Sequence, residues 1–180
     1  MLLRKINAGC SLITAMLLLD HAIFFSVWML SRGSIAKSTG VMPWILAGVT
    51  LIHALISIDL MVSGYMDSKA HRCKWYLKLN IPVIIQRMSG ILMMIFIGIH
   101  IAGAKNHFQP KMLHAVVHPL FFGVVLAHVA VSTSKSLITL GIGSAKVIKI
   151  VDIAIKILCG ATFIAGVIGF YLCLFLGIVK

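Results

Sequence analysis

Five long apolar stretches constrain the fold of this 180-residue chain more than any other feature. A helix of about 20 mostly apolar residues crosses a hydrocarbon core of roughly 30 Å and satisfies its own backbone hydrogen bonds there. The sequence therefore predicts an all-α membrane protein, a single transmembrane domain over residues 1–180 with five transmembrane helices. The predicted spans cover approximately residues 8–31, 42–66, 82–104, 113–142 and 148–179.

Composition excludes several other classes of protein. The chain is 61% hydrophobic and 11% charged, which is too apolar for a water-soluble domain of this size. Its 16 Lys and Arg residues form no aromatic-interleaved patch, so we expect contact with anionic lipid headgroups and no nucleic-acid binding. The 4 cysteines lack Cys-x-x-Cys spacing, which argues against a zinc site and a covalently attached haem.

The distribution of basic residues between the spans predicts the orientation. With a cytoplasmic N-terminus, eight Lys and Arg residues lie in the inner segments and five in the outer segments. Cytoplasmic loops carry the excess of Lys and Arg in membrane proteins. We therefore expect a multi-pass protein with its N-terminus in the cytoplasm.

One histidine lies well inside each of the first four predicted spans: His21, His53, His100 and His128. A strongly polar side chain in hydrocarbon usually faces the bundle interior and has a partner there. A hydrogen bond to a neighbouring helix would explain any one of these residues. Four of them on four consecutive helices favour a common function, and we expect their rings to be buried.

Depth in the membrane sorts these histidines into two pairs. With a rise of about 1.5 Å per residue, His21 and His100 lie roughly 20 and 25 Å above the inner boundary. The same arithmetic gives roughly 14 Å for His53 and 9 Å for His128. Two bis-histidine b haems, stacked in a bundle of the first four helices, need this arrangement. We predict that His21 and His100 ligate the outer haem iron, and His53 and His128 the inner haem iron.

Residues near these histidines are further candidates for cofactor contacts. Ser89 shares a helical face with His100. Lys135 lies one to two turns inward of His128, where its ammonium would meet a haem propionate. Arg87 would pair with a propionate or extend to the headgroups. Gly90 leaves room for a flat macrocycle or for a neighbouring helix.

The third and fourth stretches carry motifs similar to those of a known family. Residues 86–90 read Gln-Arg-Met-Ser-Gly before an apolar run to His100, similar to an Arg-x-Ser/Thr-Gly run that leads to a haem-ligating His. His128 is followed by Gly141-Ile142, much like a His to Thr-Trp-Gly-Ile stretch. The chain thus resembles the five-helix, two-haem cytochrome b membrane subunit of succinate dehydrogenases and fumarate reductases.

The first two stretches extend this resemblance. His53-Ala54 matches the His-Ala of the family's second helix, and His21 stands where its first helix carries a ligand. The likeness covers residues 8 to about 145. Each motif is weak alone, and the order and spacing of the set identify the family.

The resemblance implies an electron-transfer and quinone-reactive subunit of a larger enzyme. Such a subunit anchors a flavoprotein and an iron-sulfur protein on the cytoplasmic side of a prokaryotic cytoplasmic membrane. It carries electrons through two haem b groups between those subunits and a membrane quinone, expected to be menaquinone. The dicarboxylate site is on another subunit. The basic connection from Lys69 to Lys78 would be the docking surface for these partners.

The acidic residues depart from the family's pattern. Some relatives carry a membrane Glu two residues before the fourth-helix ligand, where this chain has Leu126, and the chain has no Glu at all. Asp20 and Asp59 are therefore the intramembrane candidates for proton transfer or quinone chemistry. Asp152 and Lys156 are four residues apart and can pair on one helical face.

The outer end of the fourth span holds two more histidines. His114 and His118 lie one helical turn apart and are candidates for quinone binding or proton relay. His118 is also a rival to His21 as ligand of the outer haem. The remaining histidines, His71 and His107, lie in connections, where we expect surface positions.

Two alternative functions remain open. The first is a two-haem cytochrome b of another quinone-linked complex, of hydrogenase or nitrate reductase type, although those relatives often place two histidines on one helix. The second is a small transporter with a histidine relay, which predicts a helix broken at mid-membrane. The prolines instead sit at or near the span ends: Pro43, Pro82, Pro110 and Pro119.

Overall fold

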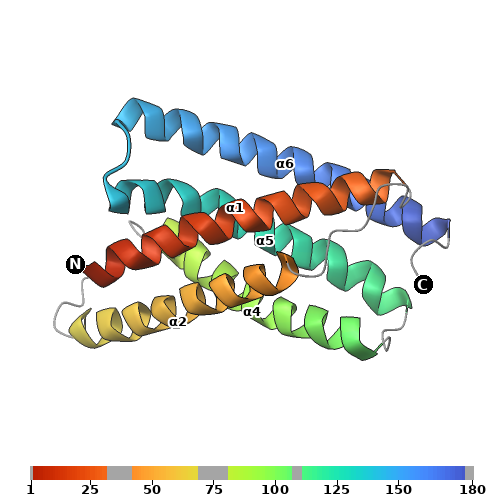
Figure 1. Ribbon diagram of the computed structural model, residues 1–180, viewed down its shortest axis with the longest axis horizontal. Coiled ribbons are helices and arrows are strands. Elements are labelled where there is room, and N and C mark those ends of the chain that lie inside the picture. Colours follow the sequence, from red (N-terminus) through yellow and green to blue (C-terminus); the bar gives the residue numbers. More distant parts are fainter. Residues whose placement is uncertain (1, 32–41, 69–80, 107–110, 177–180) are drawn as a thin grey trace.

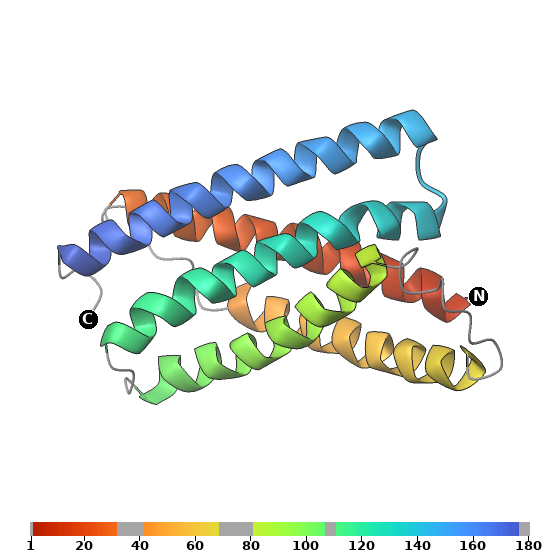
Figure 2. The same cartoon turned by 180° about the vertical axis from the view of Figure 1, so that it is seen from behind.

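The computed structural model describes residues 2–31, 42–68, 81–106 and 111–176, and these residues contain five helices (Figure 1, Figure 2). Each helix is long and apolar enough to cross a membrane. The predicted fold class is thereby confirmed. The helices are α1 (Leu2–Leu30), α2 (Met42–Ser68), α4 (Ile81–Asn106), α5 (Lys111–Leu140) and α6 (Ala145–Phe175).

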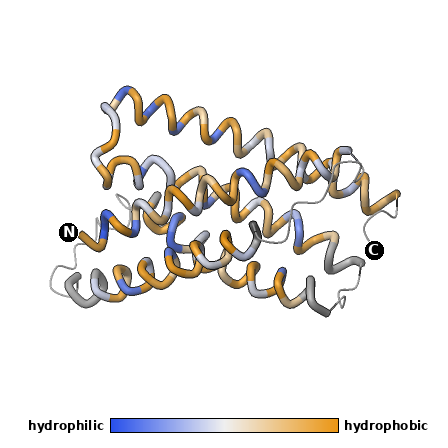
Figure 3. Tube along the Cα trace, in the orientation of Figure 1, coloured by the Kyte–Doolittle hydropathy of each residue, from blue (hydrophilic) through white to orange (hydrophobic). Residues whose placement is uncertain are grey.

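The outer surface of the bundle is aliphatic. Ile157 is 67% exposed and Ile164 is 60% exposed, whereas several Ser and Thr side chains are buried. Hydrophobic residues recur along all five helices (Figure 3). In water such a surface would aggregate, but in a bilayer it faces acyl chains of matching polarity. The distribution is that of a multi-pass membrane protein.

Helix α1 lies at the centre of the helix packing. It packs against α2, α5 and α6, while α4 packs against α5. Small side chains on the buried face of α1 let the helices approach closely, which favours association in lipid. The structure thus gives α6 a share of the core, whereas the sequence analysis assigned the bundle to the first four spans. The buried positions of α1 follow one face of the helix: Ala8, Ser11, Thr14, Ala15, Leu18, Ala22, Ser26 and Met29.

Two glycines bring α6 close to its neighbours. A Cβ atom on Gly166 would overlap the ring of Phe122 and lie 2.8 Å from Ser26 Oγ. A Cβ atom on Gly169 would lie 2.9 Å from the Cβ atom of Met29. Any larger residue at these positions would force the helices apart.

A tight turn joins α5 to α6. Gly141 has φ +72°, a left-handed conformation that favours glycine. The N–H of Ile142 donates to the carbonyl of Leu137 over 3.0 Å, and the N–H of Gly141 donates to that of Ile138 over 3.1 Å. These two bonds define a Schellman motif, which ends α5. Ser144 Oγ then accepts a backbone N–H from the first turn of α6.

Two helices begin earlier than the sequence analysis predicted. Helix α1 begins at Leu2 instead of near residue 8, and α6 begins at Ala145 instead of near residue 148. Long basic side chains reach the membrane surface while their backbone stays helical. The N-terminus and the turn between α5 and α6 lie at the same end of the bundle (Figure 1, Figure 2). The early turns of both helices carry exposed basic residues: Arg4, Lys5, Lys146 and Lys149.

An acidic residue links α5 to α6 near this end. Asp152 accepts a 2.7 Å hydrogen bond from Ser134 Oγ and forms an ion pair with Lys156. The predicted pairing of Asp152 with Lys156 is confirmed.

Candidate functional site

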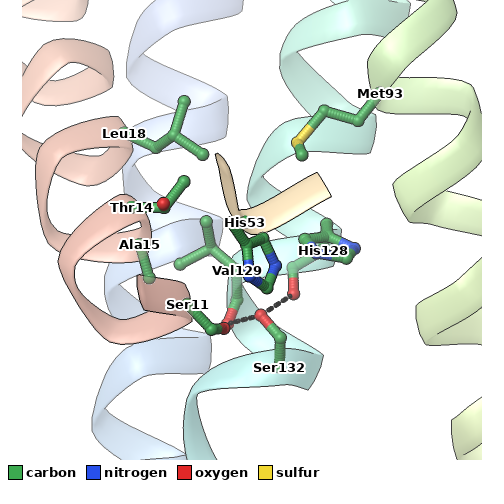
Figure 4. Close-up of a pocket in the computed structure, with 9 residues that line it drawn as sticks. All are labelled: Ser11, Thr14, Ala15, Leu18, His53, Met93, His128, Val129 and Ser132. Carbon is green, nitrogen blue, oxygen red and sulfur yellow. Dashed lines mark hydrogen bonds between the residues drawn. The ribbon is translucent and has the colours of Figure 1, made fainter. Parts of the chain in front are cut away.

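The two histidines of the predicted inner pair line one cavity. His53 comes from α2 and His128 from α5, and Figure 4 shows both rings at the same space. The cavity is small, with room for about one water molecule, and takes its lining from four helices. Nine residues line it: Ser11, Thr14, Ala15, Leu18, His53, Met93, His128, Val129 and Ser132.

The ring of His128 is buried and held by α4. Its Nδ1 atom lies 3.0 Å from Ser89 Oγ, and Ser89 Oγ donates to the carbonyl of Gln86 over 3.1 Å. Both contacts form together when His128 Nδ1 carries the hydrogen and donates it to Ser89. Nε2 is then the nitrogen with a free lone pair, and it is available to a metal ion.

Gly90 makes room for this ring. A Cβ atom at Gly90 would lie 3.2 Å from His128 Cε1 and 3.7 Å from Nδ1. The sequence analysis expected Gly90 to make room for a macrocycle or for a neighbouring helix. In the structure Gly90 makes room for the imidazole ring of His128. The ring is fixed from two sides, by the Ser89 hydroxyl and by the backbone of α4.

Two buried polar atoms at this cavity make no hydrogen bond within the described part of the chain. They are His53 Nδ1 and Thr14 Oγ1. Thr14 is only 3% exposed. Buried polar groups normally have a partner, so such atoms call for an explanation such as a bound water or ligand. The cavity is therefore chemically suited to a polar or metal-containing guest.

A basic side chain closes the inner side of the site. Lys135 Nζ donates to Gln86 Oε1 over 2.9 Å, which links α5 to α4 below His128. Gln86 thus accepts two hydrogen bonds: its side-chain oxygen accepts from Lys135, and its backbone carbonyl accepts from Ser89. Arg87 is exposed on the neighbouring turn of α4. Among the described residues, Lys135 and Arg87 are the cationic side chains near the site that can neutralise a carboxylate.

His100 has His118 as a close neighbour. The rings of His100 and His118 lie 5.6 Å apart between their centres, and the ring of Phe121 lies 5.4 Å from that of His100. His118 stacks on Phe170 of α6 with an angle of 7° between the ring planes. The structure therefore brings together His100 and His118, the rival ligand.

Of the four membrane histidines that we expected to be buried, His128 is buried, His53 is half-buried, and His21 and His100 are exposed, so the prediction is wrong for His21 and His100. Helix α1 turns its small residues Ala22 and Ser26 into the core, and His21 lies on the adjacent flank. That flank also carries Thr14, two turns away, which lines the inner cavity. His21 thus lies farther along a face that contributes to the site.

The other predicted site residues are more peripheral. Asp20 and Asp59 are exposed on α1 and α2, so the structure adds no buried acid to the site. His114 belongs to α5, but its side chain is outside the described set. The docking segment 69–78, together with His71 and His107, also lies outside the described residues.

The sequence analysis missed several polar residues that line or support the inner site. Ser11 and Thr14 line the cavity, and Gln86 joins Ser89 to Lys135. Helical spacing was the available signal for Thr14, because a residue seven positions from His21 shares its flank. Nothing local in the sequence indicates that the Gln86 side chain accepts from Lys135, which comes from a different helix.

Loss of the Ser89 hydroxyl is expected to weaken this site measurably. Ser89→Ala leaves the buried Nδ1 atom of His128 without its acceptor, which costs about 1–3 kcal/mol. Unfolding in mixed detergent should therefore begin at a lower denaturant concentration. Ser63→Ala, at an exposed position of α2, is the matched control. Equal stability of the two variants would contradict the assigned hydrogen bond.

Within the described ranges, no group of three or more His, Cys, Asp or Glu side chains is arranged to hold a metal ion. A bis-histidine haem iron takes only two protein ligands, so it does not depend on such a group. Comparisons with protein-family models, with curated proteins and with solved structures found no match.

Proposed function

We propose that this chain is a two-haem cytochrome b that anchors a succinate dehydrogenase or fumarate reductase complex in a prokaryotic cytoplasmic membrane. The observation that carries the proposal is the pair His53 and His128 at one intramembrane cavity. Ser89 orients the His128 ring, and His53 Nδ1 is buried without a hydrogen-bond partner. Imidazole nitrogens held in this way are typical metal ligands.

The donor set at the inner site fits a b-type haem. Two neutral imidazoles from facing helices supply the axial ligands, and Lys135 and Arg87 would neutralise the propionates. The cavity as it stands has room for about one water molecule, so it is far smaller than a haem. Binding therefore requires α2 and α5 to separate at this level. Among the described residues α2 packs mainly against α1, so no extensive contact holds α2 to α5.

His100 is the common ligand in both assignments of the outer haem. The ring centres of His100 and His118 are 5.6 Å apart, and this proximity supports His118 as the second ligand. The family resemblance supports His21.

A b haem supplies one-electron transfer when it is bound. The residues of this chain would orient it, neutralise its carboxylates and exclude water at two depths of the membrane. Electrons would pass between a cytoplasmic iron-sulfur protein with its flavoprotein and a membrane quinone, expected to be menaquinone. Asp20, Asp59, His114 and His118 remain the candidates for quinone binding and proton transfer. The N-terminus would face the cytoplasm.

The proposal predicts two b haems per chain. A reduced-minus-oxidised visible spectrum of the purified protein, with a pyridine haemochrome assay, measures this number. A colourless preparation that remains fully helical by circular dichroism would contradict the proposal and favour the transporter alternative.

Mild-detergent purification then tests the complex. Co-purification of a flavoprotein and an iron-sulfur protein with succinate:quinone activity is the expected result. Hydrogenase or nitrate reductase activity in that preparation would instead assign the haems to another quinone-linked complex.

A further inference from the structure

The proline in α5 removes one backbone hydrogen bond from the helix interior. Pro119 has no N–H, so the carbonyl of Ala115, four residues earlier, lacks its regular helical partner. A polar backbone group without a partner is costly within a membrane, where no water replaces the lost bond. Some other group must meet this carbonyl if α5 is to continue as a helix.

A side chain from α6 meets the carbonyl. Tyr171 Oη donates a hydrogen bond to the Ala115 carbonyl over 3.1 Å. A tyrosine hydroxyl in an apolar environment also needs a partner, so this one bond satisfies both groups. The C-terminal half of α6 and the N-terminal half of α5 lie side by side in both views (Figure 1, Figure 2).

The residue before the proline is His118. A residue that precedes proline is disfavoured in the helical conformation, because the proline ring crowds its backbone. Yet His118 is helical, stacks on Phe170 of α6 and lies against His100 of α4. Consecutive residues of α6 thus hold the backbone and the ring of this segment.

We propose that Tyr171 is a positioning residue, which holds His118 against His100 by donating to the carbonyl that Pro119 leaves without a helical partner. The inference goes beyond the proposed function, since it concerns the position of an imidazole with or without a bound cofactor. It also gives α6 a role at the site, although α6 carries none of the predicted ligands.

The test is a double-mutant cycle with Tyr171→Phe and Pro119→Ala. Tyr171→Phe removes the hydroxyl and keeps the ring, while Pro119→Ala restores an N–H to the Ala115 carbonyl. Acylation of each histidine by diethyl pyrocarbonate in the purified full-length protein is followed by mass spectrometry. The exposed His21 serves as internal reference.

We expect Tyr171→Phe to raise the acylation rate of His118 several-fold relative to His21, with no change at His53 or His128. In the Pro119→Ala background the same substitution should have little effect. An unchanged rate at His118, or an equal rise in both backgrounds, would overturn the proposal, and a general rise at all histidines would mean loss of structure instead. The readout needs no haem, so a colourless preparation, which contradicts the proposed function, leaves this test valid.

Discussion

His53→Ala and His128→Ala are each expected to remove the same one of the two proposed b haems. The two rings line one cavity, and an iron held between two helices loses half of its axial protein ligands when either ring is deleted. Haem content should fall from two per chain to one. The remaining haem should be identical in the two variants by its reduced absorption maximum and its reduction potential.

His100→Ala supplies the complementary result, because it is expected to remove the other haem. Either His118→Ala or His21→Ala should reproduce its spectrum, and the one that does identifies the second outer ligand. All three variants should retain the inner haem. Loss of different haems in His53→Ala and His128→Ala would contradict the inner pairing, whatever the outer assignment.

Gly166→Val is expected to cause the largest loss of stability in the helix packing. The added side chain would overlap the ring of Phe122 and approach Ser26 Oγ, in a region where Phe122 also packs against Phe25 and Phe163. Overpacking of a tight interior costs about 1–3 kcal/mol, and this overlap should reach the upper end of that range. At about 2–4 °C per kcal/mol, the melting temperature in detergent should fall by about 10 °C.

Gly160→Val is the matched control for this prediction. Gly160 lies on the same helix and carries the same loss of glycine, but a Cβ atom there would meet nothing within 4 Å. Its melting temperature should therefore stay close to that of the unmodified protein. Equal effects of the two substitutions would show that valine acts through helix propensity and not through the approach of α6 to the bundle.

The membrane spans and one local ion pair could be predicted from the sequence because both depend on short-range properties. Hydrophobic length decides whether a segment spans a bilayer, and residues four positions apart meet on any helix. Asp152 and Lys156 paired as expected for that reason. The early start of α6 was missed because Lys146 and Lys149 read as part of a polar connection, whereas Ser144 caps a helix that includes them.

The sequence by itself predicted the five long apolar helices and the position of each membrane histidine along its helix, since both follow from the order of residues within one segment. Only the tertiary structure decided how each helix is rotated about its axis, because that rotation depends on the side chains of its neighbours. His21 is exposed although it shares a face of α1 with the buried Thr14, while Phe170 and Tyr171 of α6 hold the segment of His118. The neighbour of His100 therefore depends on contacts between α4, α5 and α6, which helical periodicity alone does not give.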